Sequence, residues 1–327
     1  MSDYKKYLTD FHSQIVTPDE IIFDVIKGVT NKIVINKNRV IAGEANEVYD
    51  IELSDKSHVI VRISRAEKQE FEQERWAIEK CREIGVPVPE ILSLQHINFE
   101  NKPLHICIQE KLVGEPLERG EIDFHSFSEE RQRQIIFQAG EILSKIHSIK
   151  TEGFGTLNGS GKGSYATFSD LMREHVNHEE DFLSMAKEMN FDLGAMKKIF
   201  RILKEKSNSL PIIESVLNHN DFGPKHIMLK DDIISGILDF GEVNGHSPVN
   251  DFAKWDYWFS DEIPLDWLKS GYSNKTLFAD NFDEILHWIR LNNGLGVLWW
   301  YHSKKYLQAV ERAKEKLYKD LAFCGLD

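Results

Sequence analysis

The stretch that decides the fold is HNDFGPKHIMLKDDIISGILDFG, residues 219–241, which places polar residues within an apolar frame. Asp221 lies near its start, and Asp239 follows eighteen positions later, directly after an Ile-Leu pair. A carboxylate taken out of water is unfavourable unless another group pairs with it. Two carboxylates that each adjoin a hydrophobic segment therefore suggest a shared partner, and a metal ion bound to phosphates is one such partner.

The local pattern predicts that these carboxylates meet. Residues 216–222 are typical of a strand end that enters a loop, and residues 233–242 of a hairpin strand that delivers Asp239 to a loop. Because a hairpin brings its two ends together, Asp221 and Asp239 are expected to face one cleft. In phosphoryl transfer, one carboxylate accepts or orients the proton of the acceptor hydroxyl, and another holds Mg²⁺ against the nucleotide phosphates.

The bulk composition fits a cytoplasmic enzyme of one large or two ordinary domains. The 327 residues are 41% hydrophobic and 28% charged, as in soluble globular proteins. The formal net charge of -13 argues against nucleic acid as a partner, because phosphate backbones require an excess of Lys and Arg. The three cysteines show no metal or disulfide spacing, which indicates a reducing compartment. No apolar run is long enough to span a membrane, so no membrane partner is expected.

The first third of the chain is rich in strand signals. Residues 39–64 alternate as a hairpin around the turn SDKS, residues 67–85 predict a helix that Gly85 ends, and residues 104–112 predict a short buried strand. After Gly114 helical spacing prevails. The chain is therefore expected to be an α+β protein with a small strand-rich N-terminal lobe, residues 1–112, and a larger helical C-terminal lobe, residues 113–327.

Two local features of the second lobe are also predicted. Ser126 and Glu129 would form a capping box ahead of a core helix. The glycine-rich segment GFGTLNGSGKGSY, residues 153–165, is expected to be a loop. It does not match a phosphate-binding P-loop, because Thr156 stands where the first glycine should be and Lys162 is followed by glycine.

Taken in order, these motifs resemble the aminoglycoside phosphotransferase family, a branch of the protein-kinase-like fold. His219, Asp221 and His226 have the spacing of a kinase catalytic loop, and Asp239 stands where the metal-binding Asp-Phe-Gly belongs. A His at the usual Asn position is most similar to the branches with 2″-aminoglycoside and macrolide kinases. VPVPEIL, EKLVGEPL, ILSKIHSI and GILDFGEVNGHSPVNDFAKW also fit in order, so the resemblance covers nearly the whole chain and implies a two-lobed, protein-kinase-like fold.

The resemblance implies roles for residues in the second lobe. Asp221 would be the catalytic base, and Asp239 the main ligand of Mg²⁺, or of Mn²⁺, at the phosphates. His226 would take the second metal position. Because Mg²⁺ prefers oxygen ligands, His226 either binds metal weakly, acts through water, or only hydrogen-bonds to the loop of Asp221. His219 and Asp251 are expected to support that loop.

The resemblance also implies a nucleotide site in the first lobe. Arg62 stands where a kinase has its phosphate-contacting Lys. It keeps the positive charge, although a guanidinium donates from a planar, two-pronged group and an ammonium from a single nitrogen. An exposed strand Arg is the alternative interpretation. The expected helix partner of Arg62 is Glu74, with Glu70 one turn earlier as the reserve. Gly43 lies in AGEANEVY, the expected nucleotide loop, whose small residues allow backbone amides near phosphate.

The expected hinge between the lobes contains Gln109, Glu110 and Leu112. By resemblance, backbone groups of this segment would bind the nucleotide base. Side chains therefore say little about whether the nucleotide is ATP or GTP.

An acidic and aromatic region follows Asp239. Ten acidic and three basic residues lie between Asp239 and Glu284. In the family this region lines the acceptor cleft, so its carboxylates, Glu242 and Asp256 among them, would attract a cationic aminosugar. For most of these residues the alternative is a solvated acidic face.

The sequence therefore predicts a small-molecule kinase that transfers the γ-phosphate of ATP or GTP to a hydroxyl of an aminoglycoside-like acceptor. A macrolide, choline, homoserine or a sugar amine is the alternative acceptor. A kinase-fold protein that binds nucleotide without turnover is the alternative of a different class. Arg62 and His226 favour that alternative, whereas the intact Asp221 and Asp239 speak against it.

Overall fold

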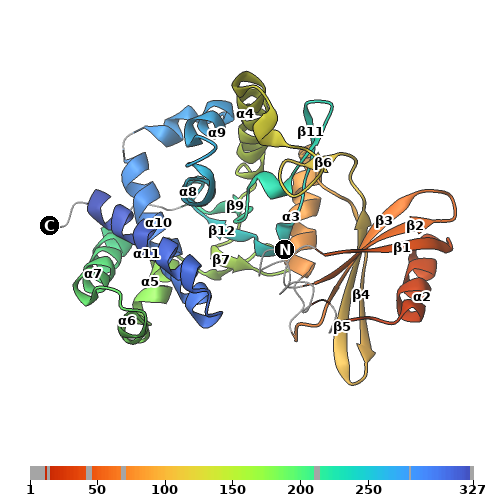
Figure 1. Ribbon diagram of the computed structural model, residues 1–327, viewed down its shortest axis with the longest axis horizontal. Helices are drawn as coiled ribbons and strands as arrows, with labels where there is room; N and C mark the ends of the chain where they lie inside the picture. The colour runs from red at the N-terminus through yellow and green to blue at the C-terminus, as the bar shows by residue number, and fades with distance from the viewer. Residues whose placement is uncertain are drawn as a thin grey trace.

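The computed structural model describes residues 12, 15–41, 46–67, 71–209, 214–279 and 281–324. An antiparallel sheet forms one end of the molecule and a larger helical body forms the other (Figure 1). The predicted two-lobed α+β architecture, strand-rich first and helical second, is confirmed. Within the described ranges, no helix combines the length and the apolar character that crossing a bilayer requires.

Five antiparallel strands form the N-terminal sheet, in the order β1-β2-β3-β5-β4. Side chains of β2 and β3 alternate between buried and more open positions, as expected for half-buried strands, and residues 54–57 turn the chain between them. β5 lies between β3 and β4 and is buried along most of its length. The strands are β1 Val34–Val40, β2 Glu47–Leu53, β3 His58–Ser64, β4 Ile91–Phe99 and β5 Lys102–Glu110.

Among the described residues, two helices accompany this sheet. Helix α2 (Asp19–Thr30), which the sequence analysis did not predict, packs against β1 and β4 and buries Ile22 and Ile26. Helix α3 (Phe71–Glu83) confirms the predicted helix. Gly85 follows it with φ +72°, a conformation that glycine adopts without strain. The inner face of α3 joins the larger, C-terminal core through Ala77, Ile78 and Cys81, so α3 connects the two bodies.

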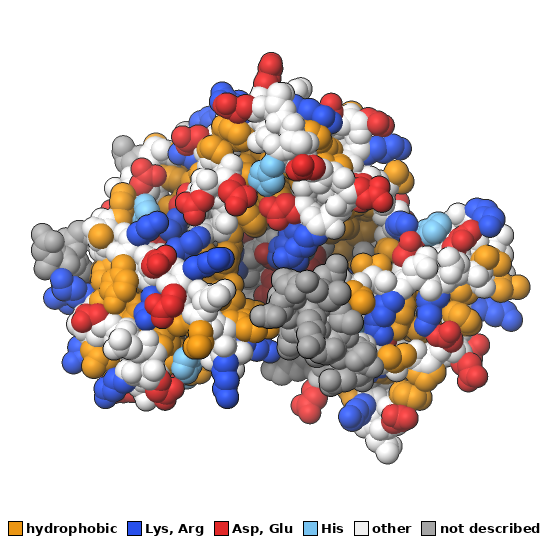
Figure 2. Space-filling model, in the orientation of Figure 1, with side chains coloured by type: hydrophobic (Ala, Val, Ile, Leu, Met, Phe, Trp, Pro, Cys, Tyr) orange, Lys and Arg blue, Asp and Glu red, His pale blue; other side chains and the backbone are white. Residues whose placement is uncertain are grey.

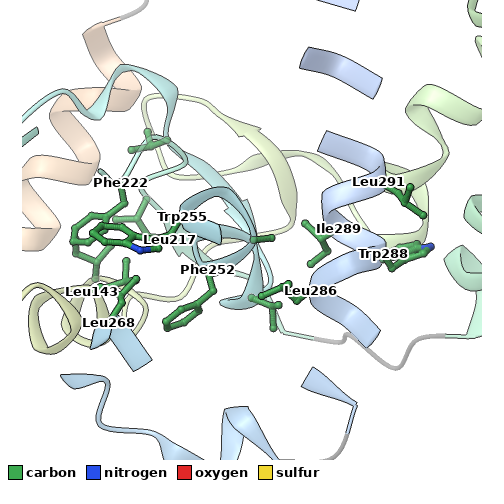
Figure 3. Close-up of a cluster of buried hydrophobic side chains, with 14 of the residues drawn as sticks. Leu143, Leu217, Phe222, Phe252, Trp255, Leu268, Leu286, Trp288, Ile289 and Leu291 are labelled. Atoms are coloured by element: carbon green, nitrogen blue, oxygen red, sulfur yellow. The ribbon is translucent and has the colours of Figure 1, made fainter. Parts of the chain in front are cut away.

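Eight helices make up most of the C-terminal body as far as the structure describes it, and the larger hydrophobic core lies among them. Figure 3 shows part of this core, where Phe222, Trp255 and Leu217 lie together near Leu143 and Leu268. The long helix α10 contributes Leu286, Trp288, Ile289 and Leu291. The helices are α4 Glu129–Ile146, α5 Phe168–Val176, α6 Glu179–Glu188, α7 Leu193–Ser209, α8 Val249–Phe259, α9 Leu265–Gly271, α10 Phe282–Ser303 and α11 Leu307–Phe323.

The start of α4 differs from the prediction. Ser128, not Ser126, caps the helix, because its hydroxyl accepts the backbone N–H of Arg131. Ser126 belongs to the short 3-10 turn η1 (Phe124–Ser126), and its hydroxyl donates to the carbonyl of Asp123. The buried ring of Phe124 fixes this turn and keeps Ser126 outside the helix. The predicted capping box was therefore wrong, and Ser128, two positions later, is the cap.

The glycine-rich segment also differs from the prediction. It forms the hairpin of β7 (Phe154–Leu157) and β8 (Gly163–Tyr165) instead of an irregular loop. The side chain of Asn158 closes the turn by accepting the N–H groups of Ser160 and Lys162. Gly163 is required by packing, because a Cβ there would lie 2.3 Å from the carbonyl oxygen of Phe154. The glycine at position 163 therefore allows the two strands to pack closely in a hairpin, where a loop was predicted.

Two small sheets hold the segments on either side of Asp221 and Asp239. One has the order β8-β7-β12-β9, with β9 at Val216–Asn218 and β12 at Asn244–His246. The other contains the hairpin of β10 (Ile227–Lys230) and β11 (Ile233–Ile237), with β6 (Glu115–Pro116) at its side. The chain thus leaves β9 near Asp221 and returns along β11 to Asp239, as the hairpin prediction required.

Candidate active site

Residues 219–226, called here the Asp221 loop, connect β9 to β10. The loop ends in a short 3-10 turn, η2 (Pro224–His226). Asn220 has φ +65°, and Asp239 beyond β11 has φ +63°, although neither is a glycine. Such left-handed backbone at non-glycine residues is unfavourable and persists only where surrounding contacts impose it, typically at functional sites.

A buried carboxylate fixes the backbone of the Asp221 loop. Asp251 on α8 accepts the N–H of His219 at 2.9 Å through Oδ2 and the N–H of Asn220 at 2.7 Å through Oδ1. His147, at the end of α4, adds a third contact to Oδ2 at 3.0 Å. Burial would raise the pKa of Asp251, but His147, His219 and the backbone of Asn220 outweigh it and hold the pKa below its usual value. The expected supporting role of Asp251 has a clear geometric basis.

His219 supports the loop from the other side. Its Nε2 lies 2.9 Å from the carbonyl oxygen of Leu238, and its Nδ1 accepts the N–H of Asp221 at 3.3 Å. Because a carbonyl can only accept, Nε2 carries the proton and the ring is neutral. Burial lowers the pKa of His219, which agrees with this state. His219 therefore ties the Asp221 loop to the segment that precedes Asp239.

Asp221, His226 and Asp239 form one cluster. One ligand atom from each lies within 4.8 Å of the others. His226 Nε2 hydrogen-bonds to Asp221 Oδ2 at 3.0 Å and lies 3.8 Å from Asp239 Oδ2, so the imidazole sits between the two carboxylates. Lys225 adds a second hydrogen bond to Asp221 Oδ2 at 2.7 Å. The sequence analysis expected these two aspartates to meet, and the structure brings them together.

Neighbouring groups hold both aspartates in the charged form. Burial works against ionisation of Asp221, but His226 and Lys225 outweigh it and hold its pKa well below the usual range. Partial desolvation likewise opposes the charge of Asp239, and the guanidinium of Arg62 leads the groups that lower its pKa. Both carboxylates are therefore ionised at neutral pH, and hydrogen-bonded charges of this kind are strong.

Arg62 on β3 and Glu74 on α3 form a direct ion pair, as the register predicted. Their side chains are 12% and 2% exposed, and the other end of the guanidinium lies 3.7 Å from Asp239 Oδ1. Burial opposes the charge of Arg62, but the carboxylates of Glu74 and Asp239 raise its pKa above the usual value. Arg62 thus connects the sheet, α3 and Asp239; the reserve candidate Glu70 lies outside the described residues.

The proposed hinge runs from the end of β5 toward the second lobe. Gln109 is buried within β5, and Glu110 bonds to the backbone around Glu90. Within the described part of the chain, the backbone N–H and C=O of Leu112 form no hydrogen bond, which leaves them available to a ligand. Gly43, expected in the nucleotide loop, lies outside the described residues.

The acidic region after Asp239 is less open than its sequence suggests. Asp256 forms an ion pair with Arg290 of α10, so a cationic ligand would have to compete with that guanidinium. Glu242, in the 3-10 turn η3 (Phe240–Glu242), is exposed. Figure 2 shows acidic and basic side chains interspersed over the visible face, which is hollowed where the two bodies meet. Other acidic members pair within the chain, namely Glu262 with His125, Asp266 with Lys269 and Glu284 with Lys206.

Two lysines near Asp221 were missed by the sequence analysis. Lys225 contacts Asp221 directly, and Lys254 on α8 lies in the field of the Asp221, Glu242 and Asp251 carboxylates. Lys225 could have been found from its position inside the loop, four residues after Asp221. Lys254 had no comparable signal, because only the packing of α8 brings it to the loop.

The residues present fit a divalent cation that prefers oxygen. Asp221 and Asp239 offer carboxylate oxygens, which suit Mg²⁺. His226 fits less well as a direct ligand. Because an ionised carboxylate can only accept, the contact with Asp221 requires that Nε2 of His226 carry the proton. The geometry therefore favours His226 as a hydrogen-bond donor that spaces the two carboxylates.

Comparison with known proteins agrees with this geometry. The model of a family described as the phosphotransferase enzyme family matches residues 38–271. Aminoglycoside phosphotransferase APH(4)-Ia has a similar structure, with a TM-score of 0.73, 15% identity, and coverage of 95% of this chain and 100% of that one. APH(2″)-IIa bound to gentamicin gives a TM-score of 0.61 at 15% identity, covering 93% and 97%.

At this identity the solved structures show the fold alone, and no curated protein sequence matches the chain. The family match, in contrast, spans most of the chain and includes the Asp221 loop, Asp239 and α8. It agrees with an ionised aspartate pair, an arginine that reaches one of the two aspartates and a loop fixed by Asp251. The chain belongs to the phosphotransferase enzyme family and is a small-molecule phosphotransferase.

Proposed function

We propose that this protein transfers the γ-phosphate of ATP or GTP to a hydroxyl group of a small cationic acceptor of the aminoglycoside type. The observation that supports this most is the Asp221, His226 and Asp239 cluster, whose ligand atoms lie within 4.8 Å of one another beside Arg62. Related folds have been solved with hygromycin B and AMP-PNP, with gentamicin, and with streptomycin and ATP. These complexes make aminoglycosides the first acceptors to test.

Asp221 is the residue that would receive the acceptor hydroxyl. Its Oδ2 already accepts from Lys225 and His226, whereas Oδ1 has no hydrogen-bond partner among the described residues. Oδ1 can therefore accept a hydrogen bond from the acceptor hydroxyl and orient its oxygen toward the phosphoryl group. Because the pKa of Asp221 is held low, orientation is its main contribution, and it takes the proton late in the transfer.

Asp239 and Arg62 would hold the nucleotide side. A Mg²⁺ or Mn²⁺ ion held by Asp239, with Asp221 nearby, would neutralise charge on the phosphates. Arg62 is fixed by Glu74 and reaches toward Asp239, so its guanidinium is placed to contact the same phosphates. The open backbone groups of Leu112 would bind the base, and the boundary between nucleotide and acceptor lobes would lie near residues 112–113.

A nucleoside diphosphate release assay tests the proposal. Hygromycin B, gentamicin, streptomycin, a macrolide, choline, homoserine and a sugar amine would each be offered with Mg·ATP and with Mg·GTP. Asp221→Asn should lower turnover of the accepted compound about 10²- to 10⁴-fold, the usual contribution of a positioned acid or base. Asp232→Asn, in the exposed turn between β10 and β11, is the matched control and should retain full activity.

The alternative of a different class predicts another pattern. If wild type and Asp221→Asn bind nucleotide equally but neither releases diphosphate with any acceptor, the protein is a nucleotide-binding module and the transfer proposal is refuted. If wild type accepts choline, homoserine or a macrolide but no aminoglycoside, the acceptor class alone is wrong.

A further inference from the structure

Three asparagines connect the Asp221 loop to α8 and α10, two helices that lie side by side (Figure 1). Nδ2 of Asn293 on α10 donates to Oδ1 of Asn250 on α8 at 3.0 Å. Nδ2 of Asn250 in turn donates to Oδ1 of Asn220 in the loop at 3.1 Å. These contacts join residues 43 and 30 positions apart, so no short stretch of the sequence contains either of them. The three residues are called here the asparagine relay.

Asn220 joins the two segments that carry the aspartates. Its Nδ2 donates to the carbonyl oxygen of Glu242 at 2.9 Å, three residues after Asp239. On the other side of Asp239, Nε2 of His219 donates to the carbonyl oxygen of Leu238, also at 2.9 Å. Two neighbouring residues of the loop therefore hold the chain before and after Asp239.

The direction of every amide in the asparagine relay is fixed by its partners. A carbonyl oxygen only accepts, so the end of Asn220 that faces Glu242 must be Nδ2. Oδ1 of Asn220 then needs a donor, which Asn250 supplies. Oδ1 of Asn250 needs a donor in the same way, and Asn293 supplies it. Asn250 is only 1% exposed, so water has little access to replace a lost partner, and an unpaired polar atom there is costly.

The asparagine relay acts directly beside the proposed catalytic residue. Asn220 has φ +65° and immediately precedes Asp221. Asp251 accepts the backbone N–H of Asn220 at 2.7 Å, and Asn250, the preceding residue of α8, donates to its side chain. Backbone and side chain are thus fixed by separate contacts, which restricts the direction in which the chain enters Asp221. Groups that orient the ligands of a metal ion typically contribute about 10- to 100-fold in metal affinity or activity.

We propose that the asparagine relay positions Asp221 relative to Asp239, and that Asn293 is its outermost positioning residue. This rests on the proposed function and deepens it: the affinity for the divalent cation depends on a residue of α10 that is two hydrogen bonds away from the loop. The ligand atoms of the two aspartates lie within 4.8 Å of each other, and Mg²⁺ demands nearly ideal octahedral geometry. A small displacement of the loop therefore weakens the site.

The test compares two neighbouring asparagines of α10. Asn293→Asp replaces the donor by an ionised carboxylate, which only accepts, so two oxygens must face each other within the asparagine relay. Asn292→Asp is the matched control and carries the same charge one position earlier. Oδ1 of Asn292 accepts from Nδ1 of His175 at 3.0 Å, and a carboxylate keeps that hydrogen bond.

Two measurements report on the site. Electron paramagnetic resonance measures Mn²⁺ binding in the presence of AMP-PNP, which needs no turnover, and the diphosphate release assay gives kcat for the accepted compound. Asn293→Asp should weaken Mn²⁺ binding and lower kcat, each about 10- to 100-fold, while KM for the acceptor stays within about threefold. Asn293→Ala, which removes the donor without adding an acceptor, should lose less. Asn292→Asp should match wild type in both measurements, and urea denaturation should confirm that each variant is folded.

Equal losses in Asn293→Asp and Asn292→Asp would reveal an effect of charge or stability and overturn the proposal for the asparagine relay. Unchanged Mn²⁺ affinity in Asn293→Asp would also overturn it, and Asn293→Ala decides in the same way if Asn293→Asp does not fold. If wild type binds Mn²⁺ with AMP-PNP but phosphorylates no acceptor, the proposed function fails, and Mn²⁺ affinity alone decides the proposal for the asparagine relay. If wild type binds no Mn²⁺ with AMP-PNP, both proposals are refuted.

Discussion

Replacement of Arg62 by Met gives the sharpest test of the site, because it separates stability from activity. The change leaves Glu74 buried, with a side chain only 2% exposed, and without its ion-pair partner. Removal of one partner of a buried ion pair typically lowers stability by about 3–5 kcal/mol. Glu74 can limit this loss by taking up a proton. From its ordinary pKa of 4.5, protonation at pH 7 costs about 3.4 kcal/mol, since one pKa unit is about 1.36 kcal/mol.

We therefore expect Arg62→Met to lower the free energy of unfolding by about 3 to 4 kcal/mol at pH 7. The loss should shrink by about 2 kcal/mol at pH 5.5, because this pH lies 1.5 units closer to the ordinary pKa of Glu74 and each unit is about 1.36 kcal/mol. The sign follows from proton binding. In this variant the folded-state pKa of Glu74 is raised by burial, so the native state holds more protons than the unfolded state and stability falls as pH rises.

Urea denaturation followed by tryptophan fluorescence at several pH values measures this effect. The double variant Arg62→Met with Glu74→Leu should regain stability to within about 1 kcal/mol of wild type, because a buried pair can be replaced by apolar residues. It should still lack phosphoryl transfer, since no guanidinium would face Asp239. Arg133→Met is the surface control: its pair with Glu129 is exposed and contributes below about 1 kcal/mol. A stability loss in Arg62→Met that is under 1 kcal/mol, or that does not change with pH, would refute the reasoning.

Three further expectations follow from the same contacts. His226→Asn should keep turnover within about tenfold of wild type, since the amide can still donate to Asp221. The variant should need no more Mg²⁺ for half-maximal turnover than wild type does. Complete inactivation in steady-state kinetics would show that His226 has a more specific role. Asp251→Ala should lower stability by at least about 2 kcal/mol and abolish transfer, because the buried N–H of His219 and the part-buried N–H of Asn220 lose their acceptor. Unchanged urea midpoints would contradict this. Ser128→Ala should lower the thermal stability by about 1 kcal/mol and Ser126→Ala by less, and the reverse order in calorimetry would restore the original capping prediction.

Several features of the site were predictable because they depend on local pattern. The strand, turn and strand periodicity around residues 227–237 predicted a hairpin, and a hairpin must return Asp239 toward Asp221. The pairing of Arg62 with Glu74 was expected from the resemblance to the kinase-like family, with the register of the charged helix favouring Glu74 over Glu70. The predictions that failed were also local: two serines two positions apart competed as a helix cap, and glycines that pack a hairpin looked like a loop.

Other features required contacts between segments far apart in the sequence. The clamp of Asp251 on the Asp221 loop joins residues 31 and 32 positions apart, and His147 reaches the same carboxylate from 104 positions away. The pairing of Asp256 with Arg290 removed a carboxylate that the sequence offered to an acceptor. No window of sequence contains both partners of such contacts, so periodicity could not reveal them.

The sequence by itself determined the class of chemistry, the two-lobed α+β fold and the aspartates that would meet, because short-range periodicity and motif order encode them. Only the tertiary structure decided which charges are neutralised and which oxygen of Asp221 is open. The physical reason is that the ionisation and hydrogen bonding of a side chain depend on its distance to other groups and on its exposure to water. Those quantities arise when α8, β9 and β11 pack together.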